Sequence, residues 1–234
     1  MNPAQSDQSA ESIVLVVDDD LVVCDQITNL LHTVGLQSKA YASASEFLKS
    51  DLPNQASCLI SDVRMPGLSG FDLHAHLVKQ RINIPIIFVS GYADIPMSVK
   101  AIKAGAVEFL TKPFRDEDLL DAVRAALDRD RHRREHEEKL NDLHRRYHAL
   151  TQREQEVMSF VVAGLMNKQV AKEIGLAEVT VKVHRHTLMK KMGARSFADL
   201  VRMARILGLP QRGEWQINDH YNASDIVAKL LRRS

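Results

Sequence analysis

The sequence predicts an α/β domain with a doubly wound, five-stranded parallel sheet, then a long helical connector and a smaller all-α domain of four helices. Two observations predict the first domain: short apolar runs end in polar residues, and amphipathic helical patterns alternate with these runs over residues 13–130. One observation predicts the last domain, since residues 148–208 contain short helical patterns in a basic segment. A length of 234 residues suits two domains of this size.

Four apolar runs in the first half are interpreted as buried strands. Each run ends at one or two polar residues whose side chains can bind ligands or react. The runs are IVLVV before Asp18 and Asp19, CLIS before Asp62, PIIFV before Ser90, and EFLT before Lys112. Because the carboxyl ends of parallel strands lie on one edge of a sheet, where ligands bind, we expect these side chains to meet.

Helical patterns separate the strands. The first follows Asp20, ends at Gly35, and has an apolar face formed by Val23, Ile27, Leu30, Leu31 and Val34. Ser43 and Glu46 have the spacing of a capping box and predict a short helix. Further helices are expected over about residues 71–80 and 94–104, and from near Asp116 onward.

The polar residues at the strand ends have the chemistry of a phosphoryl-accepting site. The Asp62 carboxylate can act as a nucleophile and form an acyl phosphate. Three neighbouring carboxylates repel one another unless a cation joins them, and Mg²⁺ prefers carboxylate and phosphate oxygens. Lys112 can pair with Asp62 and then with phosphoryl oxygens, while Ser90 offers a hydroxyl group. The alternative is that these acids are solvated loop residues.

The strings VVDDD, SDVRMPGLSG, FVSGYAD and GAVEFLTKPF resemble the receiver domain of two-component response regulators, over about residues 12–130. The resemblance implies a flavodoxin-like fold that accepts a phosphoryl group on Asp62. It implies a Mg²⁺ site formed by Asp18, Asp19, Asp62 and the carbonyl of Arg64. It also assigns the switch hydroxyl to Ser90 and the switch aromatic to Phe109. Lys112 corresponds to the invariant lysine of the family, and the Pro113 that follows it is expected to be cis. A core side chain in a strand is an equally good interpretation of Phe109.

The connector, residues 131–147, is predicted to be mostly helical. Residues 128–139, DRDRHRREHEEK, contain no apolar side chain, which predicts a solvated helix with nothing to specify a core. An apolar stripe resumes with Leu140, Leu143, Tyr147 and Leu150. His132 and His136 have the spacing of metal ligands on a helix, but a solvated pair is the favoured interpretation because no helper ligand is recognisable.

Charge divides the chain into two parts. Residues 13–130 carry sixteen acidic and eleven basic side chains, whereas residues 166–205 carry three acidic and nine basic ones. The basic part predicts a nucleic-acid ligand. Four short helices are expected over residues 148–208, opening at the Thr151–Glu154 capping box, at Asn167, at Glu178 and near Ser196. The second and third of these, joined by a turn at Gly175, have the pattern of a helix-turn-helix that enters the major groove.

Residues 148–208 resemble the LuxR-type DNA-binding domain of FixJ/NarL-type response regulators, through the motifs L-T-x-R-E, N-K, T-V-K-x-H and K-M. The resemblance implies base contacts from Lys182, Val183 and His186. It makes Lys168, Thr180, Arg185 and Lys190 candidate phosphate contacts, and places Val201 in a helix that often dimerises. His184 is interpreted as a packed core residue. Ala177 stands where relatives commonly have Ser, so the following helix is expected to lack a side-chain cap worth ~1 kcal/mol.

The two ends and the composition complete the expectations. Residues 1–12 are predicted to be disordered, and residues 209–234 form a tail in which Ile226–Leu231 can make a short amphipathic helix. Cys24 and Cys58 are interpreted as buried, reduced thiols. No apolar run reaches the ~20 residues that span a bilayer, and the start does not resemble a secretory signal, so a cytoplasmic protein without a membrane partner is expected.

The expected function is therefore a phosphorylation-activated transcription regulator rather than an enzyme. The implied cofactor is Mg²⁺, and the implied partners are a sensor histidine kinase, double-stranded DNA and a second copy of the chain, with RNA polymerase as a further candidate. One alternative is an aspartate-nucleophile phosphohydrolase, because residues 18–22, DDDLV, fit the loose pattern D-x-D-x-V. The other alternative is a DNA-binding protein that does not depend on phosphorylation.

Overall fold

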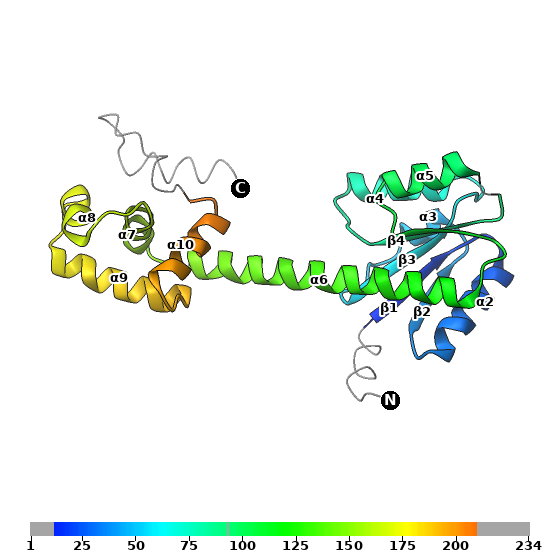
Figure 1. Ribbon diagram of the computed structural model, residues 1–234, viewed down its shortest axis with the longest axis horizontal. Helices are drawn as coiled ribbons and strands as arrows, with labels where there is room; N and C mark the ends of the chain where they lie inside the picture. Colours follow the sequence, from blue (N-terminus) through cyan, green and yellow to red (C-terminus); the bar gives the residue numbers. More distant parts are fainter. Residues whose placement is uncertain (1–11, 93, 210–234) are drawn as a thin grey trace. The chain divides into compact units, whose positions relative to one another are not determined.

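The computed structural model describes residues 12–92 and 94–209. These residues belong to two units, the first ending at Glu135 and the second beginning at His136. The helix α6 (Asp116–His148) contains this division (Figure 1). Among the described residues, no helix has both the length and the apolar composition needed to cross a membrane.

The first unit is built on a five-stranded, all-parallel sheet, as predicted. Its strands are β1 (Ser12–Val17), β2 (Gln37–Tyr41), β3 (Ala56–Asp62), β4 (Ile86–Ser90) and β5 (Glu108–Thr111), in the order β2-β1-β3-β4-β5. Because β1 and β3 are neighbours, the residues that follow them lie side by side at the point where the strand order reverses. Such a switch point is where doubly wound sheets bind ligands.

Helices cover both faces of the sheet (Figure 1). One core contains α3 (Ala44–Phe47), α4 (Gly70–Lys79) and α5 (Ile95–Lys103), together with strand residues such as Leu15, Leu59 and Phe88. The other core contains α2 (Leu21–Thr33) and the first turns of α6, packed on alternate strand residues such as Val14 and Ile60. Burial on both faces explains why the central strands are continuous apolar runs in the sequence.

The charged segment of residues 128–139 differs from the expected solvated helix. Asp130 is fully buried. Its Oδ2 accepts hydrogen bonds from the Ser57 N–H at 2.9 Å and from Arg134 Nε at 2.7 Å. Its Oδ1 accepts two hydrogen bonds from Arg133, the shorter at 2.6 Å. The expectation that nothing in this segment takes part in a core is therefore wrong, because a buried ion cluster joins α6 to the start of β3.

The second unit contains α7 (Gln152–Val162), α8 (Asn167–Ile174), α9 (Glu178–Met192) and α10 (Phe197–Ile206). The four helices lie where the sequence predicts them. The Thr151–Glu154 capping box is present at the start of α7. The last turns of α6 take part in the same core, which includes Leu143, Leu150, Val157, Val170, Val181, Leu188, Met192 and Leu200.

The turn between α8 and α9 has the expected features. Gly175 ends α8 with a φ of 66°, in the left-handed region that glycine adopts without strain. Ala177 occupies the N-cap position of α9 and makes no side-chain hydrogen bond there. The predicted lack of a cap is confirmed, and α9 begins without the ~1 kcal/mol that a Ser at this position provides.

The structure refines several smaller expectations. Ser12 is a buried strand residue and Leu209 packs in the second core, so both lie inside the ordered units. The expectations for residues 1–11 and 210–234, including the short helix at Ile226–Leu231, fall outside the described residues. Cys24 and Cys58 are buried free thiols, as predicted, and burial raises the pKa of each.

Candidate functional site

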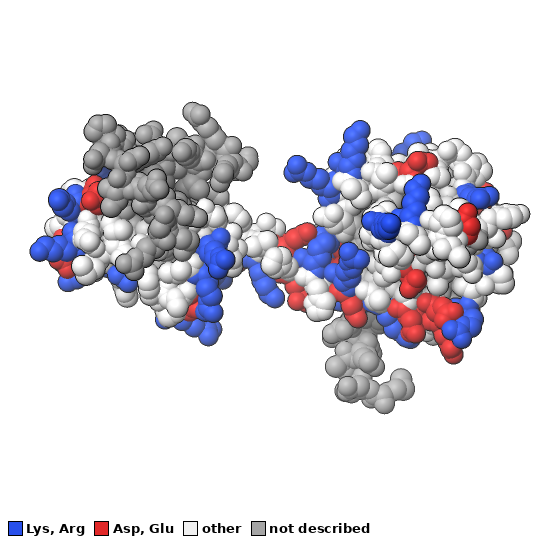
Figure 2. All heavy atoms as spheres, turned by 45° about the horizontal axis from the view of Figure 1, so that its top comes forward, with Lys and Arg blue, Asp and Glu red and all other residues white. Residues whose placement is uncertain are grey.

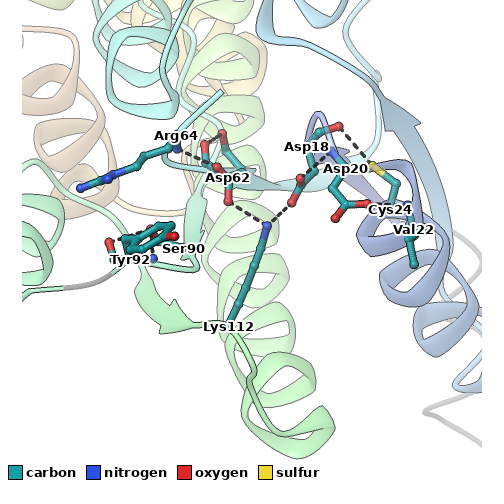
Figure 3. Close-up of polar contacts among 10 residues, drawn as sticks. Asp18, Asp20, Val22, Cys24, Asp62, Arg64, Ser90, Tyr92 and Lys112 are labelled. Carbon is teal, nitrogen blue, oxygen red and sulfur yellow. Dashed lines mark hydrogen bonds and ion pairs between the residues drawn. The ribbon is translucent and has the colours of Figure 1, made fainter. Parts of the chain in front are cut away.

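Lys112 joins two buried carboxylates at the carboxyl edge of the sheet (Figure 3). Its Nζ lies 2.6 Å from Asp18 Oδ2 and 2.8 Å from Asp62 Oδ1. Asp18 follows β1, Asp62 ends β3 and Lys112 follows β5, so the sheet brings distant parts of the chain together. Asp18 is 1% exposed and Asp62 is 5% exposed. The structure thus unites three of the residues that the sequence predicts to meet, and the Lys112–Pro113 peptide bond is cis as expected.

Burial and ion pairing shift the pKa values of Asp18 and Lys112 in opposite directions. Burial raises the pKa of Asp18, although hydrogen bonds from Lys112 and from the Asp20 N–H favour its charged form. Burial also opposes the charge on Lys112, but hydrogen bonds to Asp18 and Asp62 raise the pKa of this lysine above its usual value. Since two carboxylates share one ammonium group, the cluster is net negative when all three groups are ionised. Such a site attracts a further cation.

The backbone around Asp62 holds its carboxylate in place. Asp62 Oδ2 accepts a hydrogen bond from the Arg64 N–H at 2.6 Å. Gly70, the first residue of α4, is buried and donates its N–H to the carbonyl of Val63 at 3.1 Å. A Cβ atom on Gly70 would overlap the carbonyl oxygen of Asp62 and approach Ser61 Oγ. The start of α4 therefore packs directly against the strand end that carries Asp62.

A Gly70→Ala substitution is expected to destabilise the first unit by ~1–3 kcal/mol, because the added methyl group must displace the end of β3 or the start of α4. Urea denaturation of the full chain, followed by hydrogen exchange in β3, measures the loss. Gly91→Ala is the matched control, since a Cβ atom on Gly91 meets nothing within 4 Å. Equal stability of the two variants would contradict the close packing inferred at Gly70.

Ser90 lies at the end of β4, buried, with its hydroxyl bound to the loop that follows. Ser90 Oγ donates to the Tyr92 carbonyl at 3.0 Å and accepts from the Tyr92 N–H at 3.3 Å. The Arg64 guanidinium lies over the Tyr92 ring at 5.2 Å (Figure 3). The Ser90 hydroxyl is therefore hydrogen-bonded to its own loop in this structure. Tyr92 was not predicted to take part in the site, because no pattern in the sequence marks this exposed side chain.

The remaining predicted residues of this site lie at its margin. Asp19 is exposed, while Asp20 caps α2 by accepting a hydrogen bond from the Val22 N–H at 2.9 Å. Phe109 is partly buried against the core that contains Phe88. Over residues 12–92 and 94–209, no three His, Cys, Asp or Glu side chains are gathered as a ready-made metal site. The structure therefore brings Asp18 and Asp62 together without Asp19.

The oxygen atoms at the cluster suit a hard divalent cation. Asp18 Oδ2 and Asp62 Oδ1 lie 2.6 and 2.8 Å from the same lysine nitrogen, so both carboxylates face one point at which a cation is already held. Mg²⁺ commonly binds one or two carboxylates and keeps water molecules in its other positions. The donor set and the negative charge of the cluster therefore fit Mg²⁺. Chemically, the site offers two buried carboxylates that share one ammonium group.

The second unit presents the predicted DNA-contacting residues mostly at its surface. On α9, Lys182, Val183 and His186 are exposed, and Lys182 pairs with Glu178 across one helical turn at 3.3 Å. Lys168 and Lys190 are exposed as well, whereas Thr180 and His184 are half-buried. Lys and Arg side chains are spread over this unit in Figure 2, with few acidic ones among them. The exposed side chains of α9 therefore include Lys182, His186 and Lys190, which a polyanion can contact.

Arg185, a predicted phosphate contact, also makes contacts within the second unit. Its Nη1 donates to Asn167 Oδ1 at 3.1 Å, and its guanidinium lies over the Phe197 ring at 5.4 Å. These contacts link α9 to the starts of α8 and α10. Arg185 therefore holds three helices together in this structure, and its contact with a DNA phosphate stays a prediction.

Comparison with protein-family models gives two matches. Residues 14–124 match the response regulator receiver domain, and residues 148–204 match the bacterial regulatory proteins of the luxR family. The first segment contains Asp18, Asp62 and Lys112, and the second contains all of α9.

Comparison with individual proteins covers most of the chain. It is 53% identical to nodulation protein W of Bradyrhizobium diazoefficiens over 204 residues, which are 87% of this chain and 90% of that protein. It is 48% identical to the response regulator protein TmoT of Ectopseudomonas mendocina over 197 residues, 84% of this chain and 90% of TmoT. The solved structure of the response regulator StyR matches with a TM-score of 0.77 and 46% identity, covering 83% of this chain and 98% of StyR.

Proposed function

Because the chain belongs to the response regulators that join a receiver domain to a LuxR-family DNA-binding domain and regulate transcription, we propose that phosphorylation of Asp62 controls its binding to DNA. The observation that carries this proposal is the buried cluster in which Lys112 joins Asp18 and Asp62. A buried acid pair that shares one cation has no evident structural purpose at a surface edge. A phosphoryl site gives it one.

In the proposed reaction, an oxygen atom of Asp62 attacks the phosphorus of a phosphohistidine on a sensor histidine kinase. The new O–P bond forms as the P–N bond breaks, and the departing histidine nitrogen keeps the electron pair and takes up a proton. Lys112, 2.8 Å from Asp62 Oδ1, is placed to pair with the transferred oxygens. The proposed Mg²⁺ ligands are Asp18, Asp62, Asp19 after a local movement, and the Arg64 carbonyl; the ion would neutralise the carboxylates and the phosphoryl oxygens.

The phosphoryl group would signal through the loop after β4. It adds about two negative charges at the sheet edge, which attract the Ser90 hydroxyl away from the Tyr92 backbone. Release of that loop would move α5, with Phe109 changing its packing below it. The exposed side chains of Ile95, Val99 and Ile102 lie on one face of α5, at spacings of four and three residues. We propose this apolar face as the surface through which two phosphorylated copies pair.

The output is DNA binding by the second unit. We propose that Lys182, Val183 and His186 contact base edges from α9, and that Lys168, Thr180, Arg185 and Lys190 contact phosphates. A dimer would place two such helices on a two-part operator, from which the protein can contact RNA polymerase. These events belong in the cytoplasm, where kinase output and chromosomal DNA meet. The acyl phosphate would be lost by slow hydrolysis, without the steady turnover of an enzyme.

Beryllofluoride, a mimic of the phosphoryl group, is expected to convert the full-length protein from monomer to dimer in the presence of Mg²⁺. Affinity for an operator, first located by footprinting on genomic DNA, is expected to rise by roughly 5- to 150-fold, the usual range of coupling between two sites. Analytical ultracentrifugation and a fluorescence anisotropy titration measure the two effects. Removal of Mg²⁺ with a chelator is expected to abolish both.

Two outcomes would decide against the proposal. An operator affinity that beryllofluoride leaves unchanged would favour a DNA-binding protein that does not depend on phosphorylation. Steady release of phosphate from a phosphomonoester, dependent on Asp18 rather than Asp62, would favour a phosphohydrolase. Val99→Asp on the proposed dimer face is the matched variant for pairing, and it is expected to keep the phosphoryl mimic but lose the dimer.

A further inference from the structure

The last turns of α6 contact the C-terminal end of the DNA-reading helix α9. Arg146 Nη1 donates a hydrogen bond to the carbonyl oxygen of Met192 at 3.1 Å. Met192 is the last residue of α9, where the carbonyl groups have no partner further along the helix. A positive side chain at this end of a helix also complements the negative end of its dipole. Arg146 therefore acts as a C-terminal cap supplied by a different helix.

Gly193 and Asp142 lie beside the hydrogen bond between Arg146 and Met192 and favour it. Gly193 ends α9 with a φ of 69°, and a Cβ atom there would overlap Nη1 of Arg146. Glycine thus supplies both the left-handed turn and the space for the guanidinium. On the other side, Asp142 Oδ2 lies 2.7 Å from Arg146 Nη2 and keeps the guanidinium directed at α9. The side chain is held by one acid on its own helix and by one carbonyl of α9.

The same part of α6 is packed into the second unit. Leu143 is buried in the core that contains Met192, and Tyr147 packs against that core. The Tyr147 carbonyl accepts a hydrogen bond from Gln155 Nε2 of α7 at 3.2 Å. A movement of the final turns of α6 therefore reaches α9 through a polar contact as well as through apolar packing.

We propose that Arg146 is a positioning residue for the DNA-reading helix, and that it makes the orientation of α9 depend on the last turns of α6. The inference rests on the proposed control of DNA binding by phosphorylation. The helix α6 begins at Asp116, just after Lys112, and continues without a break to His148. The last turns of α6 belong to the second unit and follow the receiver domain in the chain, and Arg146 is their polar contact with the end of α9.

The test compares the ratio of operator affinities with and without beryllofluoride in four full-length proteins. Arg146→Met keeps the aliphatic part of the side chain and removes the donors, and it is expected to reduce the ratio about tenfold or to unity. Arg145→Met is the matched control, because Arg145 is exposed and pairs with the same Asp142 at 3.4 Å without a contact to α9 in the structure. Arg146→Lys keeps a charged donor and is expected to recover most of the ratio seen in the unchanged protein.

The outcomes separate this inference from the function on which it rests. A ratio near one in the unchanged protein and in Arg145→Met overturns the proposed phosphorylation control, and this inference with it. A large ratio in both that persists in Arg146→Met overturns the positioning role alone. If Arg146→Met lowers the operator affinity equally with and without beryllofluoride, the positioning role is also overturned. A cap that only stabilises α9 would lower both affinities by the same factor. Hydrogen exchange of the last amides of α9, faster in Arg146→Met than in Arg145→Met, is expected alongside.

Discussion

An Asp62→Asn substitution is expected to reduce phosphoryl incorporation from acetyl phosphate or from a kinase to background. The amide of asparagine is not a nucleophile, and the other buried carboxylate of the cluster, Asp18, is less exposed and directs Oδ2 at Lys112. Asparagine has nearly the size and shape of aspartate and keeps one oxygen acceptor, for either Lys112 or the Arg64 N–H, so the fold is expected to survive. Retention of radiolabelled phosphate on the full-length protein measures the effect.

The matched control is Asp51→Asn, which changes an exposed acid in the loop before β3. This variant is expected to be labelled as well as the unchanged protein. Hydroxylamine, which cleaves acyl phosphates, should release the label, and mass spectrometry of the labelled peptide should place it on residue 62. Undiminished labelling of Asp62→Asn, or a label on Asp18, would contradict the assignment of the acceptor.

The sequence predicted the sheet well where burial leaves a clear signal. The central strands β1, β3 and β4 are buried on both faces, so each contains a run of apolar residues that could be placed to within a residue or two. The strand β2 could be counted but not located. It lies at the edge of the sheet, reads QSKAY, and buries fully only Tyr41. An edge strand with solvent on several sides has no hydrophobic pattern to reveal it.

In the candidate site, too, some features could be predicted from the sequence, while others depend on how the chain packs. The positions of Asp18, Asp62 and Lys112 follow from the topology, because each one stands at a strand end. The hydrogen bonds of Ser90 with Tyr92 depend on how one loop folds back, and nothing in the sequence distinguishes the exposed Asp19 from the buried Asp18 beside it. The role of Gly70 could not be predicted for a similar reason, because its close approach to Asp62 depends on how α4 packs against the end of β3.

Asp130 is the clearest case of a residue whose burial the sequence pattern did not predict. In DRDRHRREHEEK it looks like any other charge on a solvated helix. Its burial is decided by the Ser57 N–H, 73 positions earlier, and by two arginines that follow it on α6. Hydrophobic periodicity reveals the apolar face of a helix, but a buried ion cluster consists of charged side chains and leaves no such pattern. A charge run that borders a domain can therefore contain one of the domain's core residues.

An Asp130→Ala substitution is expected to destabilise the first unit by about 3–5 kcal/mol, the usual loss when one partner of a buried ion pair is removed. Arg133 and Arg134, each less than a third exposed, would keep their charges without the carboxylate that binds both. The Ser57 N–H, near the start of β3, would lose its acceptor. Such a loss is a large part of the ~5–15 kcal/mol that stabilises a typical domain.

Urea denaturation of the full chain, with hydrogen exchange in β1 and β3 to separate the first unit from the second, measures this change. Asp128→Ala is the matched control, two residues away on the same helix. Asp128 is 64% exposed and pairs with Arg131 at 2.7 Å, so its loss should cost less than ~1 kcal/mol. A similar cost for both variants would mean that Asp130 is solvated after all. A large difference would instead show that the first unit extends into α6 at least to Arg134, because only burial gives one of two acids in the same charge run so much larger an effect.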